Sequence, residues 1–156
     1  MSLQEELGLK RGFSILAHEA LLNIYYTASF LKKASKDFFK MHNITEVQFN
    51  LMMLLFYQAE EQGGLTQVEL SKMMLVNKAN ITSLVDRMEK AHLVARTSTP
   101  GDRRYNLIRL TAYGKKLLLD IEDKYHKRIY EIMSEIKDSE QNKLIKILEG
   151  IRKNLQ

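Results

Sequence analysis

Two groups of polar and cationic side chains in the middle of the chain have the chemistry to bind nucleic acid. The first is Arg103-Arg104, which follows a Pro-Gly corner and Asp102. A guanidinium group on a projecting loop can enter the minor groove of DNA, whose negative potential is strongest where the groove is narrow. Asp102 can hold the guanidinium fork of Arg104 in place and reduce the entropy lost on binding. Taken alone, a D-R-R sequence in a loop is more typical of a solvated turn.

The second group lies on a helix predicted from Asn77 to about Lys90. A rotation of roughly 100° per residue gathers its apolar residues on one side, namely Ile81, Leu84, Val85 and Met88. The opposite face and its flanks are small or polar, and hold Ala79, Asn80, Thr82, Ser83, Asp86, Arg87 and Lys90. Such a face can approach base edges in a major groove, which is about 12 Å wide and admits one helix. The start of the helix favours a phosphate.

The charge distribution supports a nucleic-acid partner for this region. The whole chain has a formal net charge of +5, and residues 66–110 alone carry 8 Lys and Arg against 4 Asp and Glu, which gives +4. A local basic surface attracts phosphate, although a charge bias by itself is also typical of a solvated face.

Composition sets the broad class of protein. A chain of 156 residues with 45% apolar content predicts one domain over residues 1–156. The chain has no cysteine, which excludes disulfides and thiolate metal sites and fits the cytoplasm. Its longest apolar run, residues 51–57, is far shorter than the roughly 20 residues that span a membrane. We therefore expect a cytoplasmic protein without a membrane segment.

The elements that must position the two groups follow from hydrophobic period and capping residues. The predicted order is α-α-α-α-β-β-α-α, a mainly α fold with a small β-hairpin. The helices are expected at about 12–41, from 45 to the Gly63-Gly64 pair, at 66–74, 77–90 and 111–136, and from 138 or 139 onward, with strands at 93–97 and 105–110. Capping boxes of Thr45 with Gln48 and of Thr66 with Glu69 mark two helix starts, and Thr111 marks a third.

Two short helices followed by a basic hairpin form the plan of a winged helix-turn-helix, which we place at residues 45–114. The helix from Thr111 spans about 39 Å at 1.5 Å per residue and overhangs this lobe. Its apolar stripe predicts a homodimer formed by helices in residues 1–44 and 115–156. An elongated monomeric bundle is the alternative.

The stretch from Leu65 to Leu118 resembles the MarR family of bacterial transcriptional regulators. The family pattern LT-x-x-EL appears as Leu65-Thr66 with Glu69-Leu70, and VT-x-x-VD-x-LE as Ile81-Thr82, Val85-Asp86 and Met88-Glu89. The patterns GLV-x-R, DRR and LT-x-x-G appear as Leu93-Val94 with Arg96, as Asp102-Arg103-Arg104, and as Leu110-Thr111 with Gly114. His92 and Leu75 stand where the family usually has glycine, so slightly altered turn geometry is expected there.

This resemblance implies a dimeric, sequence-specific DNA-binding regulator, most commonly a repressor, on a pseudo-palindromic operator. The expected DNA-binding residues are Lys78, Ala79, Asn80, Thr82, Ser83, Arg87, Asp102, Arg103 and Arg104. Arg104 corresponds to the family's minor-groove arginine, oriented by Asp102. Some members carry arginine at the position of Ser83, so Asn80, which is suited to adenine, becomes the better candidate for base readout.

The sequence bears on three other interpretations. An enzyme is not expected, because the chain has neither a phosphate-binding glycine loop nor a nucleophile with a base, and its four histidines lack ligand spacing, so no cofactor or metal is predicted. A winged-helix protein-interaction module without DNA binding is the main alternative. A small aromatic or lipophilic effector is compatible with the family. The candidate pocket residues are Tyr25, Tyr26, Met52, Phe56 and Met73, although such stripes are more often core.

Overall fold

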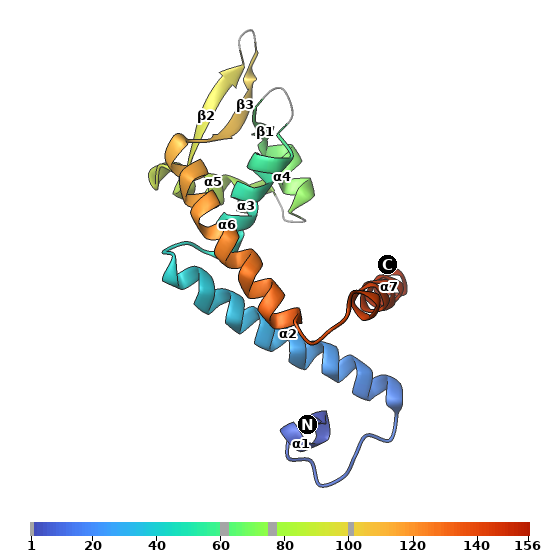
Figure 1. The fold of residues 1–156 in the computed structure, drawn as a ribbon. Coiled ribbons are helices and arrows are strands. Elements are labelled where there is room, and N and C mark those ends of the chain that lie inside the picture. Colours follow the sequence, from blue (N-terminus) through green and yellow to red (C-terminus); the bar gives the residue numbers. More distant parts are fainter. Residues whose placement is uncertain (1, 60–62, 75–77, 100–101) are drawn as a thin grey trace.

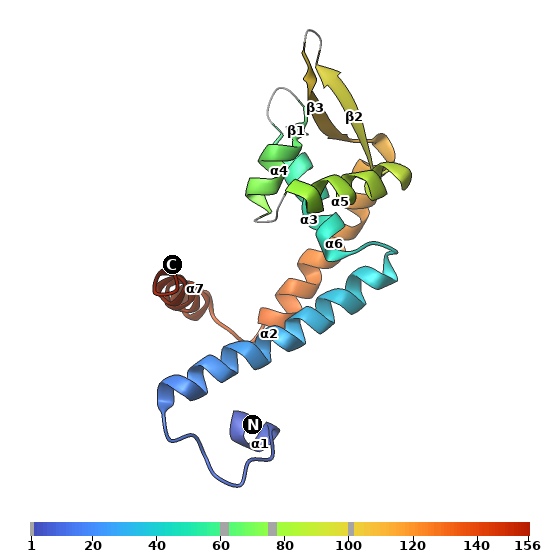
Figure 2. The ribbon, with the colours of Figure 1, turned by 180° about the vertical axis from the view of Figure 1, so that it is seen from behind.

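The computed structural model describes residues 2–59, 63–74, 78–99 and 102–156. Figures 1 and 2 show a winged lobe at one end and helices that extend away from it toward both termini. The elements are α1 (Leu3–Glu6), α2 (Leu16–Met41), α3 (Glu46–Tyr57), β1 (Leu65–Thr66), α4 (Gln67–Met73), α5 (Lys78–Lys90), β2 (Val94–Thr99), β3 (Asp102–Leu110), α6 (Ala112–Met133) and α7 (Asp138–Lys153). None of the helices in these ranges is both long and apolar enough to cross a membrane.

The predicted caps at three helix starts are confirmed. At α3 the hydroxyl of Thr45 accepts a hydrogen bond from the backbone of Gln48 at 3.2 Å, and Gln48 Oε1 accepts one from the backbone of Thr45 at 2.8 Å. Thr66 and Glu69 repeat the arrangement at α4. The hydrogen bonds from the backbone N–H and hydroxyl of Thr66 favour the ionised carboxylate and lower the pKa of Glu69. Each box satisfies backbone donors that the helix itself leaves unpaired.

Several predicted boundaries are wrong. The first long helix begins at Leu16 rather than near Gly12, and α6 ends at Met133 rather than Ile136. Gly63-Gly64 does not end α3, which stops at Tyr57. Gly64 instead allows the backbone to pass close to β3, because a Cβ there would come within 2.7 Å of the carbonyl oxygen of Ile108. The predicted cap at Asn77 and the family departure at Leu75 lie outside the described residues.

The sheet has three antiparallel strands in the order β1-β3-β2. The two long strands confirm the hairpin, and both extend further toward residues 100 and 101 than the sequence indicated. The third strand, β1, was missed because two residues show no readable period. Thr66 pairs with Leu107 and is also the N-cap of α4, so the strand passes directly into the helix. The sheet therefore joins the wing to the first helix of the helix-turn-helix.

One hydrophobic core holds the winged lobe together. It draws on α3, α4, α5, the sheet and the first half of α6, and it also takes in Phe39 from the end of α2. The predicted apolar face of α5 is confirmed, since the four residues on it are buried. The core residues with the least exposure are Phe39, Phe49, Leu51, Met52, Leu70, Ile81, Val85, Met88, Val94, Ile108, Leu118 and Ile121.

The helices outside this core are packed differently. We call α1, α2, α7 and the second half of α6 the outer helices. No residue of α7 is buried, and Ile145 is 53% exposed. In α6 the buried residues end at Glu122, while Ile129 and Ile132 further along remain exposed. The predicted apolar stripe of α6 is therefore covered by the lobe in its first half and left uncovered by the described chain in its second half.

Candidate nucleic-acid interface

The exposed face of α5 is the face that the sequence predicted to approach base edges. Its apolar side is buried in the lobe, and the small and polar residues on the other side are accessible. The exposed residues of this face are Ala79, Asn80, Ser83, Asp86, Arg87 and Lys90. A helix that presents such a face, anchored by a buried apolar side, has the geometry needed to lie in a major groove.

Two of the predicted DNA-binding side chains make internal contacts. The hydroxyl of Thr82 donates to Gln67 Oε1 at 3.0 Å, so it joins α5 to α4 and fixes the angle of the helix pair. Arg87 Nε donates to the carbonyl oxygen of Ser83 at 3.2 Å, which holds the guanidinium along the outer face of α5. Contact of either residue with DNA stays a prediction.

A charged cluster that sequence reasoning missed ties the wing to α5. The guanidinium of Arg96 in β2 forms ion pairs with the carboxylates of Asp86 and Glu89, and the backbone N–H of Arg96 donates to Glu89 Oε1 at 3.2 Å. Burial opposes the charged form of Arg96, but the two carboxylates outweigh it and raise the pKa of this group. The cluster neutralises acidic side chains that would otherwise repel phosphate, and it sets the wing relative to the helix.

The signal for this cluster was present in the sequence. Asp86, Glu89 and Arg96 each belong to a family motif, but Asp86 was assigned only to the outward face of its helix. The contact joins a helix to a strand, so no helical or strand spacing brings the three residues together. Placing them requires the turn between α5 and β2.

That turn depends on a strained residue. His92 has φ of +57°, a left-handed conformation for which glycine is the usual residue. Its carbonyl oxygen accepts a hydrogen bond from the hydroxyl of Thr111 at 2.6 Å. His92 therefore adopts the left-handed backbone conformation that favours glycine, the residue usual at this position in the family.

The surroundings of Gly114 explain why the LT-x-x-G motif ends in glycine. Its backbone N–H donates to Thr111 Oγ1 at 2.9 Å, and its Cα faces the backbone of Leu93. A Cβ at Gly114 would lie 2.0 Å from the carbonyl oxygen of Leu93, a distance that no side-chain adjustment can relieve. Glycine is therefore required where α6 passes the end of α5.

The remaining predicted DNA contacts lie on the wing and at the first residue of α5. The backbone of β3 begins at Asp102, so Asp102, Arg103 and Arg104 belong to the outer part of a strand rather than to a loop. The side chains of these three residues and of Lys78 lie outside the described part of the structure. Orientation of Arg104 by Asp102 stays a prediction.

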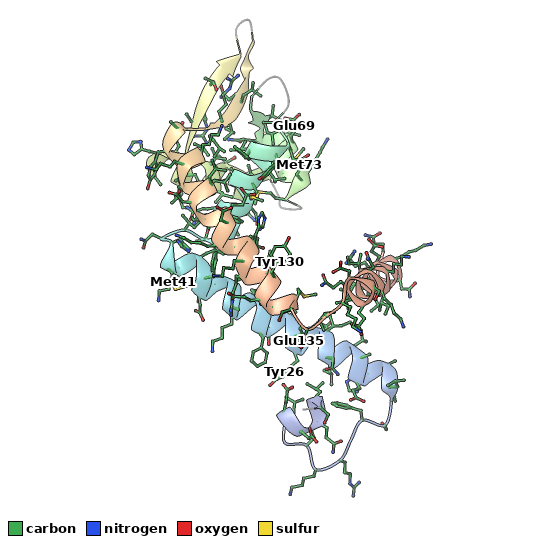
Figure 3. All side chains as sticks on the ribbon, in the orientation of Figure 1. Tyr26, Met41, Glu69, Met73, Tyr130 and Glu135 are labelled. Carbon is green, nitrogen blue, oxygen red and sulfur yellow. The ribbon has the colours of Figure 1, made fainter. Side chains whose placement is uncertain are left out.

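None of the cavities found among the described residues is lined by all five residues predicted to form a ligand pocket, and that pocket stays a prediction. Tyr25 and Tyr26 lie on α2 beside α1 and line a small cavity with Leu3 and Leu7. Met52 has no exposed surface and belongs to the core, because its position on α3 faces the lobe interior. Phe56 packs against Tyr57. Figure 3 shows Met73 on the winged lobe, far along the molecule from Tyr26.

Comparison with known proteins agrees with this geometry. A model described as the MarR family matches residues 44–105. The HTH-type transcriptional regulator FarR of Neisseria gonorrhoeae is 31% identical over 106 residues, which cover 68% of this chain and 69% of FarR.

Two solved structures share the fold. AbsC, a MarR family transcriptional regulator from Streptomyces coelicolor, aligns with a TM-score of 0.82 and 18% identity, over 94% of this chain and 98% of AbsC. The S. aureus MepR–DNA complex aligns with a TM-score of 0.75 and 21% identity, over 86% of this chain and 96% of the MepR chain. With the helix-turn-helix, the wing and the family motifs in register, the chain belongs to the MarR family and is a winged-helix, DNA-binding transcriptional regulator.

Proposed function

We propose that the protein is a cytoplasmic repressor that binds a pseudo-palindromic operator as a homodimer, without a catalytic step. Helix α5 lies in the major groove of each half-site, where Asn80 and Ser83 contact base edges, and the wing arginines 103 and 104 lie along the minor groove. Residues 45–114 act as the DNA-binding lobe, and residues 1–44 and 115–156 as the dimerisation helices. Repression is proposed because it is the commoner outcome in the family.

The observation that carries DNA binding is the division of α5 into two faces. Ile81, Val85 and Met88 have no exposed surface, while the small and polar side opposite them is open. The ion pairs of Arg96 remove the charge penalty of the acidic residues at the end of that face. The described geometry therefore favours a polyanion over the alternative of a protein-interaction module.

The dimer is supported by the outer helices. Tyr130 is 77% exposed on α6, and Leu144 and Ile145 are exposed on α7. Large apolar side chains gathered on extended helices favour burial against another surface. A second copy of the chain is the proposed partner, because a two-fold dimer presents two copies of α5 to successive turns of one duplex.

A selection of random duplexes bound by the full-length protein tests the proposal. We expect an enriched motif with two-fold symmetry and half-sites about 10 base pairs apart. In Asn80→Ala we expect the preference to relax at one base pair per half-site, at a cost of roughly 1–3 kcal/mol. Thr27→Ala on α2 is the matched control and should keep the parent motif.

The salt dependence of binding separates the two candidate functions. Neutralisation of several phosphates releases counterions, so the affinity for the selected duplex should fall steeply as salt rises. Failure to enrich any motif, together with a flat salt dependence, would favour the protein-interaction module instead.

A further inference from the structure

We propose that Gln67 is a positioning residue that gives Thr82 its base specificity. Gln67 takes the hydroxyl proton of Thr82, so this hydroxyl can only accept a hydrogen bond from DNA and selects an exocyclic amino group in the major groove. Gln67 is the first residue of α4, and Thr82 lies in the first half of α5. The inference rests on the proposed function, because it requires α5 to lie in the major groove.

One hydrogen bond between the two helices carries the inference. Thr82 Oγ1 donates to Gln67 Oε1 at 3.0 Å, and the bond is partly buried. A hydroxyl has a single proton and two lone pairs. Because the proton is directed toward Gln67, the lone pairs are what the oxygen can offer to a second partner. Partial burial strengthens this bond relative to one in open water.

Both ends of this hydrogen bond are held in place by other contacts. Thr66, immediately before Gln67, pairs with Leu107 of β3 and is also the N-cap of α4. Ile81, immediately before Thr82, has no exposed surface and anchors this turn of α5 in the core. The direction of the Thr82 hydroxyl is therefore set before DNA binds, which lowers the entropy cost of a contact with a base.

Thr82 lies at the edge of the face that approaches DNA. Its side chain is half-buried, whereas Asn80 and Ser83 on the same face are exposed. The exposed hydroxyl of Ser83 can rotate and therefore either donate or accept. The two neighbouring hydroxyls thus differ in what they can recognise, although the residue types are similar.

The major groove offers few partners to a hydroxyl that only accepts. Adenine N6 and cytosine N4 are the amino donors there, whereas guanine O6, thymine O4 and the purine N7 atoms are acceptors. Phosphate oxygens are acceptors too. Thr82 can bond to any of these acceptors only by giving up its bond to Gln67. We therefore expect adenine and cytosine to be accepted on one strand at the base pair that Thr82 contacts.

The first step of the test finds this base pair. Random duplexes are selected with the full-length parent and with Thr82→Val, which keeps the side-chain shape and removes the hydroxyl. We expect the preference at one base pair per half-site to fall by roughly three- to tenfold, an amount typical of one neutral hydrogen bond. Thr82→Ser keeps a hydroxyl and should keep the preference.

The outcomes of this step separate the two proposals. A parent motif that Thr82→Val leaves unchanged at every position would overturn the inference about Gln67 and Thr82 alone. Failure of the parent to enrich any motif would contradict the proposed function, and the inference would fall with it.

A base analogue then identifies the atom that Thr82 contacts. The selected duplex is made with adenine at this position and, separately, with 2-aminopurine, which still pairs with thymine but carries no amino group in the major groove. In fluorescence anisotropy we expect the analogue to weaken binding of the parent by roughly three- to tenfold and to affect Thr82→Val much less. Equal affinity of the parent for the two duplexes would overturn the inference.

Variants of Gln67 test its role. Gln67→Leu releases the hydroxyl proton, so Thr82 can also donate, and the loss caused by 2-aminopurine should shrink to within about twofold. Gln67→Glu keeps the acceptor and should keep the full loss, although its charge weakens binding to both duplexes alike. In a Thr82→Val background, Gln67→Leu should no longer change the effect of the analogue.

Ser83 provides the control for a purely structural role. If Gln67 only set the angle between α4 and α5, Gln67→Leu would also weaken the preference that is lost in Ser83→Ala. We expect that second preference to be kept. Loss of both preferences in Gln67→Leu, or a Gln67→Glu protein that behaves like Gln67→Leu, would overturn the role assigned to Gln67. If Gln67→Leu fails to fold, Gln67→Ala removes the same acceptor and takes its place.

Discussion

The winged lobe and the outer helices use similar residues in opposite ways. In the lobe, apolar side chains of α3, α4, α5 and the sheet fill a single core. In the outer helices, side chains of the same types, such as Ile129, Ile132 and Ile145, remain exposed. Helix α6 belongs to both regions, with buried residues in its first half only. The difference indicates that the lobe is stabilised by its own contacts, whereas the outer helices require another surface.

This contrast separates the two tasks of the regulator. A lobe with its own core can hold the faces of α5 and the wing in fixed positions. Helices that bury their apolar side in a partner set the distance between two such lobes, and this distance selects the spacing of half-sites. Substitutions of equal chemistry in the two regions should therefore have very different effects.

The largest effect is expected from glycine replacement in the lobe. Gly114→Ala places a Cβ against the carbonyl oxygen of Leu93, and we expect a loss of about 3–4 kcal/mol in the free energy of unfolding. Gly150→Ala in α7 meets no atom within 4 Å and should instead stabilise the helix by about 0.5–1 kcal/mol. Thermal and urea unfolding of both variants measure this contrast. Equal losses in the two variants would contradict it.

The second effect concerns assembly rather than folding. Ile145→Glu puts a charge on the uncovered face of α7, and we expect dimer affinity to fall by roughly a hundredfold, or about 2.7 kcal/mol. The unfolding of the lobe should be nearly unchanged. Sedimentation velocity across a concentration series measures the dimer. Lys146→Gln changes the net charge by the same amount and serves as the control. An Ile145→Glu protein that stays dimeric would argue for another interface.

A smaller effect is expected from breaking ion pairs in the two regions. Arg96→Met leaves Asp86 and Glu89 without their partner beside the DNA-facing surface, so affinity for the selected duplex should fall by about tenfold, or about 1.4 kcal/mol. Arg128→Met removes the exposed pair with Glu131 on α6 and should change little, because such pairs contribute about 0–1 kcal/mol. Fluorescence anisotropy at fixed salt compares the two. Indistinguishable affinities would show that the Arg96 cluster does not support DNA binding.

The smallest effect tests backbone strain. His92→Gly relieves a left-handed conformation but adds freedom to the unfolded chain, so we expect a gain of only about 0.5 kcal/mol in stability. Asn43→Gly, at φ of +56° where α2 meets α3, should gain less, because asparagine tolerates this region better than most residues. Unfolding midpoints in urea measure both. A loss of stability in His92→Gly would mean that the imidazole makes a compensating contact.

The caps and the faces of helices could be predicted from the sequence because they depend on local spacing. Thr45 with Gln48 and the two sides of α5 are examples, since each involves residues within a few turns of one helix. The motif register also predicted the winged lobe, because the family patterns mark its turns.

Contacts between distant elements could not be read in this way. The strand β1 is two residues long and exists only because β3 offers an edge to it. Tyr57 and Glu122 are 65 residues apart and meet only once α3 packs on α6. The sequence could not place the predicted ligand pocket for the same reason, since aromatic and methionine residues at helical spacing do not reveal which helices will face each other.

Thr66 gives the lobe a property that its separate parts would lack. Because this residue is paired with β3 and also caps α4, a tilt of the wing moves the first turn of α4 with it. The wing therefore cannot adjust to a narrow or wide groove without reorienting the helix pair. Operators that differ only in the shape of their flanking DNA should accordingly be distinguished by the protein, even where the bases that α5 contacts are identical.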